Sequence, residues 1–161
     1  MKNIFLVGIV GAALSVSCSS VKTAQTAQQN RAEFLKLKGD WQITSVDYDK
    51  SFRVKPFDEG ADAQCFVGSQ WKLIPNNYSG SYTLNGGAGC PSLTQPIKFE
   101  VLQGNTFQFK KIAEGTKAKQ NLSGYTLYLV NQDANYFTLE QNIPFEGQTV
   151  KVRYNFQKIS N

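Results

Sequence analysis

The most constraining feature of the sequence is a strict alternation of apolar and polar residues near its C-terminus. In residues 148–159 the apolar side chains Val150, Val152, Tyr154 and Phe156 share one parity, and Lys, Arg, Asn and Gln occupy the positions between and after them. Side chains of a β-strand point alternately to opposite faces, so this pattern predicts a strand with one buried face and one hydrated face. Such strands build a sheet around a single apolar interior.

Seven further segments have strand patterns and follow one another closely along the chain. Their expected limits are residues 41–49, 70–75, 80–85, 97–103, 106–112, 124–130 and 135–141. Residues 76–80 and the pair Gly104–Asn105 predict hairpin turns, whereas residues 86–96 predict a loop. Eight sequential strands without a long helix between them predict an all-β fold, an eight-stranded antiparallel up-and-down β-barrel, whose closure leaves no exposed sheet edge.

Two local irregularities adjoin the first predicted strand. Its apolar parity slips between Ile43 and Val46, which predicts a bulge that bends the strand at a barrel corner. Residues 28–36 contain helix formers, with Phe34 and Leu35 as bulky apolar side chains. This segment predicts one short helical turn that plugs an end of the barrel.

The composition limits the classes of function. A chain of 161 residues with 41% hydrophobic content can build one domain with a core. The chain has no histidine and three cysteines, which excludes Ser-His-Asp and Cys-His catalysis and the usual zinc sites. The net charge of +5 comes from scattered Lys and Arg, without the clustering that nucleic-acid binding requires. We therefore expect no enzyme, no cofactor, no metal and no nucleic-acid partner.

The N-terminus is typical of an exported protein. Residues 1–17 contain one lysine, an apolar run and small residues before Cys18, which predicts a secretory signal peptide that is too short for a transmembrane helix. The ending resembles a bacterial lipobox, which implies that Cys18 carries diacylglycerol and a palmitate-type acyl chain; ordinary cleavage nearby is the alternative. We expect residues 18–33 to form a lipid-anchored flexible tether and residues 34–161 to form the barrel domain.

The resemblance to a lipoprotein also implies a location. Ser19 follows the lipidated cysteine, as in lipoproteins sorted to the outer membrane, and residues 18–24 lack the acidic cluster associated with surface export. The expected location is therefore the cell envelope, with a lipid anchor in the outer membrane and the domain facing the periplasm. We expect a monomer there.

Two cysteines, Cys65 and Cys90, remain in the predicted domain. In an oxidising compartment, two cysteines within one domain most simply pair as a disulfide. Buried free thiols and an intermolecular bridge are the alternatives.

Several motifs together resemble a known family. Gly39-Asp40-Trp41, at the start of the first strand, resembles the first signature of the lipocalins and is a fold signature of the closed end of the barrel. Residues 65–101 contain a Cys-x-x-x-Ser-x-Trp segment, an Asn-rich hairpin, a Gly-x-Tyr-x-Leu strand and a Cys-Pro pair, as in bacterial lipocalin-like lipoproteins of the calycin superfamily. The resemblance covers residues 35–159.

The chain also departs from the lipocalin pattern. A Thr-Asp-Tyr turn, the second lipocalin signature, is not present as such. The third signature supplies an arginine that stacks on the first-strand tryptophan, and Arg153 is the only arginine of the last strand. Its parity places Arg153 on the polar face, and Lys158 lies nearer the strand end that meets Trp41.

The family resemblance implies a cup that binds a small hydrophobic or amphipathic ligand. A barrel interior of eight strands can hold one small ligand or be filled by side chains, so a filled structural or protein-interaction barrel is the alternative. The candidate ligand contacts are the inward residues Trp71, Phe99, Phe107, Phe109, Leu127, Phe137, Leu139, Tyr154 and Phe156.

Residues 49–64 form a long, mixed-charge segment after the first strand. In lipocalins this link lies over the mouth of the cup, so Phe52 and Phe57 are candidate lid residues; a loop that packs on the outside is the alternative. Its acidic residues Asp58, Glu59 and Asp62 are close in sequence. Adjacent carboxylates in a solvated loop normally neither bind a cation nor catalyse a reaction.

Overall fold

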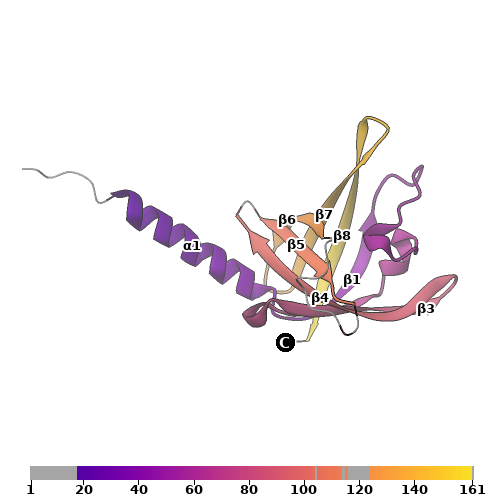
Figure 1. Ribbon diagram of the computed structural model, residues 1–161, viewed down its shortest axis with the longest axis horizontal. Helices are drawn as coiled ribbons and strands as arrows, with labels where there is room; N and C mark the ends of the chain where they lie inside the picture. The colour runs from indigo at the N-terminus through magenta and orange to yellow at the C-terminus, as the bar shows by residue number, and fades with distance from the viewer. Residues whose placement is uncertain (1–17, 104, 114, 116–123, 161) are drawn as a thin grey trace, which may run out of the picture.

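One helix precedes eight β-strands in the computed structural model, which describes residues 18–103, 105–113, 115 and 124–160 (Figure 1). The helix and the three short 3-10 helices are α1 (Cys18–Lys36), η1 (Pro56–Asp58), η2 (Ala63–Phe66) and η3 (Pro75–Asn77). The strands are β1 (Gly39–Asp47), β2 (Gln70–Ile74), β3 (Ser79–Gly87), β4 (Cys90–Leu102), β5 (Thr106–Lys111), β6 (Tyr125–Gln132), β7 (Tyr136–Phe145) and β8 (Gln148–Ser160). The expected signal peptide, residues 1–17, and the glycine of the Gly104–Asn105 turn lie outside the described residues.

The strands close into a single barrel. Each strand pairs antiparallel with the next, and β1 pairs with both β2 and β8. The register brings Trp41 opposite Trp71 on one side and Val46 opposite Tyr154 on the other. The fold is therefore an eight-stranded antiparallel up-and-down β-barrel, as the alternation predicted.

The predicted bulge in β1 is present. Ile43 pairs with Phe156 and Ser45 pairs with Asn155, so Thr44 is the extra residue on its strand. Because the bulge restores the parity, Ile43 and Val46 both point into the core. A bulge of this kind bends the strand and increases its twist, which helps a sheet of few strands to close.

The prediction of a loop over residues 86–96 is wrong. β3 extends to Gly87 and β4 begins at Cys90, so most of this segment is a paired ribbon. The turn between the strands has positive φ at Ala88 (49°) and Gly89 (83°), as in a two-residue hairpin turn. Residues 86–96 contain Leu93 as their one large hydrophobic side chain, and the Thr83 and Thr94 hydroxyls lie 3.0 Å apart, so no apolar alternation marks the ribbon in the sequence.

The closed end of the barrel is built around Trp41. Its indole Nε1 donates a hydrogen bond of 2.8 Å to the carbonyl oxygen of Leu37, and its ring meets Phe137 edge to face at 4.7 Å. The Nζ of Lys158 lies 5.3 Å from the centre of an indole ring, within cation–π range. Arg153 does not take this role, because its Nε donates to Glu140 at 2.9 Å on the outer face.

Helix α1 is longer than predicted. The sequence predicted a polar tether and one helical turn, but the structure is helical from Cys18 to Lys36. Alanine, glutamine and lysine favour helix without supplying an apolar stripe. The plug of the closed end consists of Phe34 and Leu37, both buried, whereas Leu35 is exposed.

Helix α1 projects away from the barrel (Figure 1). Among the described residues, α1 included, no helical segment combines the length and the apolar character that a membrane span requires. Arg31 of α1 contacts the barrel through Tyr78, whose hydroxyl accepts a hydrogen bond of 3.2 Å.

Two strands also continue past the barrel at its opposite end. β6 pairs with β7 only as far as Glu140, and β1 pairs with β8 only from Arg153 onward. Residues 141–145 and 148–152 therefore pair with each other alone. We call this two-stranded extension, which rises from the barrel in Figure 1, the β7–β8 arm.

Candidate ligand-binding site

The nine predicted ligand contacts all lie in the barrel core. Each is 3% exposed or less: Trp71, Phe99, Phe107, Phe109, Leu127, Phe137, Leu139, Tyr154 and Phe156. Several contact one another directly, with Phe137 and Phe156 stacked at 4.2 Å and Phe99 and Phe107 stacked at 5.4 Å. Their inward orientation follows the predicted parity, and in this structure they pack as a core. Their role as ligand contacts stays a prediction.

Phe57 of the segment after β1 fills the mouth of the barrel. Its side chain is only 3% exposed. Five rings surround it at centroid distances of 5.0 to 6.3 Å, and they come from η2, β2, β5, β6 and β8: Phe66, Trp71, Phe109, Tyr125 and Tyr154. The candidate lid residue Phe57 is therefore enclosed by aromatic side chains of the barrel and of η2.

Polar contacts hold the lid residues Phe57, Asp58 and Glu59 in position. The Nζ of Lys111 donates to the Phe57 carbonyl oxygen at 2.8 Å and lies 3.0 Å from Oε1 of Glu59. The Tyr125 hydroxyl lies 3.1 Å from the Phe57 carbonyl oxygen and 2.7 Å from Oδ2 of Asp58.

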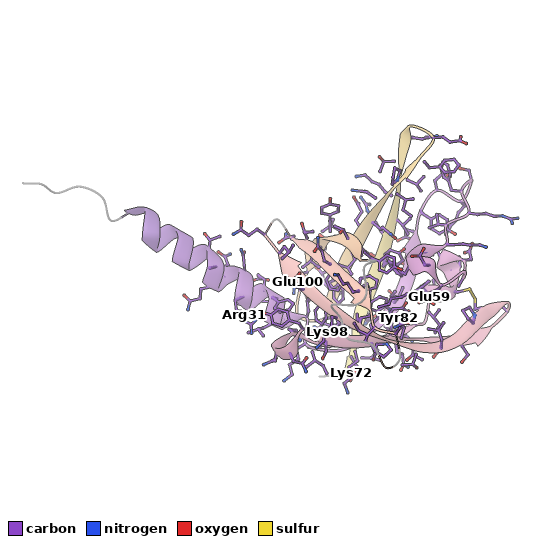
Figure 2. The ribbon with its side chains drawn as sticks, viewed as in Figure 1. Arg31, Glu59, Lys72, Tyr82, Lys98 and Glu100 are labelled. Atoms are coloured by element: carbon purple, nitrogen blue, oxygen red, sulfur yellow. A yellow bond between two sulfur atoms is a disulfide. The ribbon has the colours of Figure 1, made fainter. Side chains whose placement is uncertain are left out.

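Tyr82 completes this set of contacts. Its hydroxyl donates to Oε1 of Glu59, and Figure 2 labels the two residues close to one another. We call Tyr82, Lys111 and Tyr125 the latch, because these three barrel residues bind the backbone and carboxylates of the lid.

The lid backbone is strained where it enters the barrel. Phe57 has φ 58° and Asp58 has φ 53°, a left-handed conformation that costs a residue with a side chain roughly 1 to 2 kcal/mol. Such a conformation persists only where surrounding contacts impose it. Here the ring contacts of Phe57 and the latch supply those contacts, so the closed lid depends on them.

The far end of the lid segment is fixed covalently. Cys65 of η2 and Cys90 of β4 form a disulfide with a Cα–Cα distance of 5.4 Å, which confirms the predicted pairing. Asp62 caps η2 by accepting a hydrogen bond of 2.9 Å from the Gln64 amide. The segment between β1 and η2 is therefore fixed at both of its ends.

The second lid candidate, Phe52, lies outside the barrel mouth. It packs edge to face on Phe145 of the β7–β8 arm at 5.5 Å. Together with Val54, Ile143 and Val150 they line a hollow of about 430 Å³. Phe52 is thus part of the rim and does not enter the core.

Other hollows between described residues also lie on the outside. One of about 380 Å³ lies over β4, β5 and β6 and is bordered by the exposed side chains of Lys98, Glu100 and Lys110. Two of the nine predicted ligand contacts, Phe99 and Phe109, also border this hollow, and Phe137 and Phe156 border another of about 320 Å³ beside β1, β7 and β8.

Burial keeps the tyrosine hydroxyls of the mouth protonated. Burial raises the pKa of Tyr82 far above its ordinary value, and the neighbouring Glu59 carboxylate raises it further. Burial, followed by Asp58 and Glu59, likewise raises the pKa of Tyr125. Both hydroxyls therefore remain hydrogen-bond donors across the ordinary pH range.

The three acidic residues of the lid segment serve separate contacts. Asp58 accepts from Tyr125, Glu59 pairs with Lys111 and Tyr82, and Asp62 caps η2. Asp58 and Glu59 are thus parts of the lid closure, a role that the sequence analysis did not assign to them.

The sequence analysis did not identify the latch, although the strand alternation places two of its residues on the inward face. Lys111 shares the parity of Phe107 and Phe109, and Tyr82 shares that of Leu84. A lysine at a position that the alternation assigns to the apolar face indicates either the end of the strand or a polar contact inside the barrel. Here β5 ends at Lys111, and the side chain points into the mouth.

The comparisons with known proteins bear on the fold of the chain. No protein-family model and no curated protein matches the chain. Its fold is similar to that of lobster apocrustacyanin A1, with a TM-score of 0.50 and 14% sequence identity over 90% of this chain and 71% of that chain. Apocrustacyanin C2 gives a TM-score of 0.48 at 14% identity over the same shares of the two chains.

Proposed function

We propose that this protein is a binding module for a small hydrophobic or amphipathic ligand, which enters the barrel when Phe57 leaves it. The observation that carries the proposal is the environment of Phe57, a single loop side chain enclosed by five rings from separate elements. Removing that side chain would leave an aromatic-lined space at the mouth, which is the usual character of a small-molecule site.

The strained lid supports the same proposal. Opening of the lid would relieve the left-handed backbone strain at Phe57 and Asp58, but it would also break the ring contacts of Phe57. A ligand that replaces those ring contacts shifts the balance toward the open lid, because it binds the open form alone. The lid is thus an internal competitor of the ligand.

The neutral fluorophore N-phenyl-1-naphthylamine tests this proposal. We expect Phe57→Ala to bind the probe about tenfold more tightly than the wild type, because the competitor is removed. Phe52→Ala removes the same ring from the rim and should leave the affinity unchanged. Absence of binding to both the wild type and Phe57→Ala would contradict a ligand-binding cup. Native mass spectrometry of protein isolated from its source would then identify a natural ligand.

A filled barrel that binds a protein partner is the second candidate. It is favoured by the apolar rim, where Phe52 and the exposed Phe145 lie beside a hollow of about 430 Å³. The same titration separates the two functions, because a filled barrel binds no probe even after Phe57 is truncated. We expect no catalytic activity in either case.

We also propose that the protein is a bacterial lipocalin-like lipoprotein of the cell envelope, anchored in the outer membrane through Cys18 and facing the periplasm. The proposal rests on the lipobox-like residues before Cys18 and on Ser19 after it. A mass spectrum of the mature protein should show a diacylglycerol adduct on a chain that begins at Cys18. An unmodified N-terminus would contradict the anchor without affecting the proposed ligand.

A further inference from the structure

The latch contains three hydrogen-bond donors at the inner edge of the barrel mouth. The Lys111 ammonium belongs to β5, the Tyr82 hydroxyl to β3 and the Tyr125 hydroxyl to β6. Their partners all belong to the lid: the Phe57 carbonyl oxygen and the carboxylates of Asp58 and Glu59. The latch is therefore occupied by oxygen acceptors, two of which are carboxylates.

The lid resembles a bound small molecule in its chemistry. The Phe57 ring fills the apolar space, while the carboxylate of Glu59, whose side chain is 9% exposed, contacts Lys111 and Tyr82 beside that space. Phe57 and Glu59 thus present an aromatic ring and a carboxylate to the barrel. The barrel groups that receive them remain in place when the lid moves, because they belong to paired strands.

We infer that the ligand of this barrel is a compact carboxylic acid with an aromatic or similarly sized apolar body, and that Tyr82, Lys111 and Tyr125 bind its carboxylate. This inference rests on the proposed ligand-binding function and adds the ligand class. A ligand of this class replaces both parts of the lid, since its ring takes the place of Phe57 and its carboxylate takes the place of Glu59.

The charge of Lys111 explains why an acid is favoured over a neutral molecule. The Lys111 side chain is 24% exposed in the closed structure. When the lid leaves, its ammonium loses both the Glu59 carboxylate and the Phe57 carbonyl, and a partly buried cation without a partner is unfavourable. A ligand carboxylate restores charge-assisted hydrogen bonds to this ammonium and to the two hydroxyls. A neutral molecule of the same shape does not.

The test compares 2-naphthoate with 2-naphthalenemethanol, which has a similar shape and no charge, by isothermal titration calorimetry. In the Phe57→Ala chain we expect the acid to bind at least about tenfold more tightly than the alcohol. Adding Lys111→Met should bring the ratio of the two affinities close to one. Lys110→Met is the matched control, because the adjacent Lys110 is exposed on the outer face, and it should preserve the ratio.

The ratio separates recognition of the carboxylate from a structural role of Lys111. A structural defect would weaken both probes together, whereas loss of the carboxylate contact weakens the acid alone. If Lys111→Met does not fold, Tyr125→Phe removes one hydroxyl at nearly constant shape and should lower the ratio about threefold. Circular dichroism confirms the fold of each variant.

Each outcome bears on the inference in a defined way. If both probes bind with equal affinity and neither Lys111→Met nor Tyr125→Phe changes the ratio, the carboxylate site is wrong and the ligand-binding barrel stands. If neither probe binds to Phe57→Ala, the barrel function and the carboxylate site are both wrong. A preference for the acid that depends on Lys111 and not on Lys110 supports both.

Discussion

The indole of Trp41 is tied to the carbonyl oxygen of Leu37 by a buried hydrogen bond of 2.8 Å. This bond joins the first strand of the barrel to the chain that follows helix α1, four residues earlier. Because the ring also meets Phe137 and the ammonium of Lys158, Trp41 connects three separate segments at the closed end.

Replacing this tryptophan should therefore destabilise the whole barrel. We expect Trp41→Phe to lower the free energy of unfolding by about 2 kcal/mol, since it removes the bond to Leu37 and leaves a gap in the core. Lys158→Met should cost at most about 1 kcal/mol, because it removes only a cation–π contact near the surface. Urea unfolding measures both. Equal costs for the two variants would argue against the buried hydrogen bond as the main contribution.

The disulfide between Cys65 and Cys90 should make a larger contribution. The two cysteines are 25 residues apart, and closing a loop of this length stabilises a protein by about 3.5 kcal/mol in the chain-entropy description. The double variant Cys65→Ser/Cys90→Ser should lose about this much in urea unfolding under oxidising conditions. A loss below about 1 kcal/mol would show that the unfolded chain is already restricted without the bridge.

Glu140 should make the free energy of unfolding depend on pH in the acidic range. Its carboxylate accepts a hydrogen bond from Arg153, which lowers the pKa; burial opposes this effect, and Lys151 adds to the lowering. A carboxyl whose folded pKa lies below its unfolded value of about 4.3 stabilises the fold above that pH. The contribution is lost as the pH falls through the folded pKa.

Unfolding measured from pH 6 down to about pH 3 tests this dependence. Glu140→Gln should show a shallower loss of stability than the wild type. Glu146→Gln, in the exposed turn of the β7–β8 arm, controls for removal of one carboxylate. Identical slopes for Glu140→Gln and the wild type would contradict the assignment.

The buried tyrosines should make the stability fall in alkali. Burial raises the pKa values of Tyr82, Tyr125 and Tyr154 above the ordinary value of about 10. Their contribution to the free energy of unfolding is complete below the tyrosine pKa of the unfolded chain. It is lost as the pH rises above that value, because the unfolded chain then releases protons that the folded protein retains.

Tyrosinate absorbance and thermal unfolding between about pH 9 and pH 12 measure this effect. Tyr82→Phe should reduce the alkaline decline in melting temperature, since one of the retained protons is removed. If all tyrosines of the folded protein ionised together near pH 10, the buried hydroxyls of the latch would have to be solvated.

The barrel could be predicted from sequence because its signal is local. The alternation of Val150, Val152, Tyr154 and Phe156 identifies a strand without knowledge of its neighbours, and Ile43 and Val46 reveal even the bulge of β1. The β3–β4 ribbon left no such signal, because Leu93 is the one large hydrophobic residue among residues 86–96. Helix α1 was missed for a related reason, since it buries little apolar surface and leaves no stripe in the sequence.

The family resemblance named Phe57 as a candidate lid residue, but its insertion among the core rings could not be predicted, because that insertion depends on contacts that are distant in sequence. Phe57 stands between Pro56 and Asp58 in an aperiodic segment, and its partners Phe109 and Tyr154 lie far along the chain. The position of Lys111 in the alternating pattern indicated either a strand end or an inward polar contact, and only the contact with the lid distinguishes the two. Strand periodicity thus predicted which aromatic side chains point into the barrel, whereas the contacts that hold Phe57 among them left no periodic signal.

The β7–β8 arm has two free sheet edges, although closure of the barrel removes such edges elsewhere in the sheet. Beyond Glu140 and Arg153 each strand of the arm has one hydrogen-bonded neighbour, so its amides should exchange with solvent earlier than those of the closed sheet. A free edge can also recruit a second molecule as an additional strand. Pro144, which has no amide hydrogen, and the charged Lys151 work against such pairing with a second molecule.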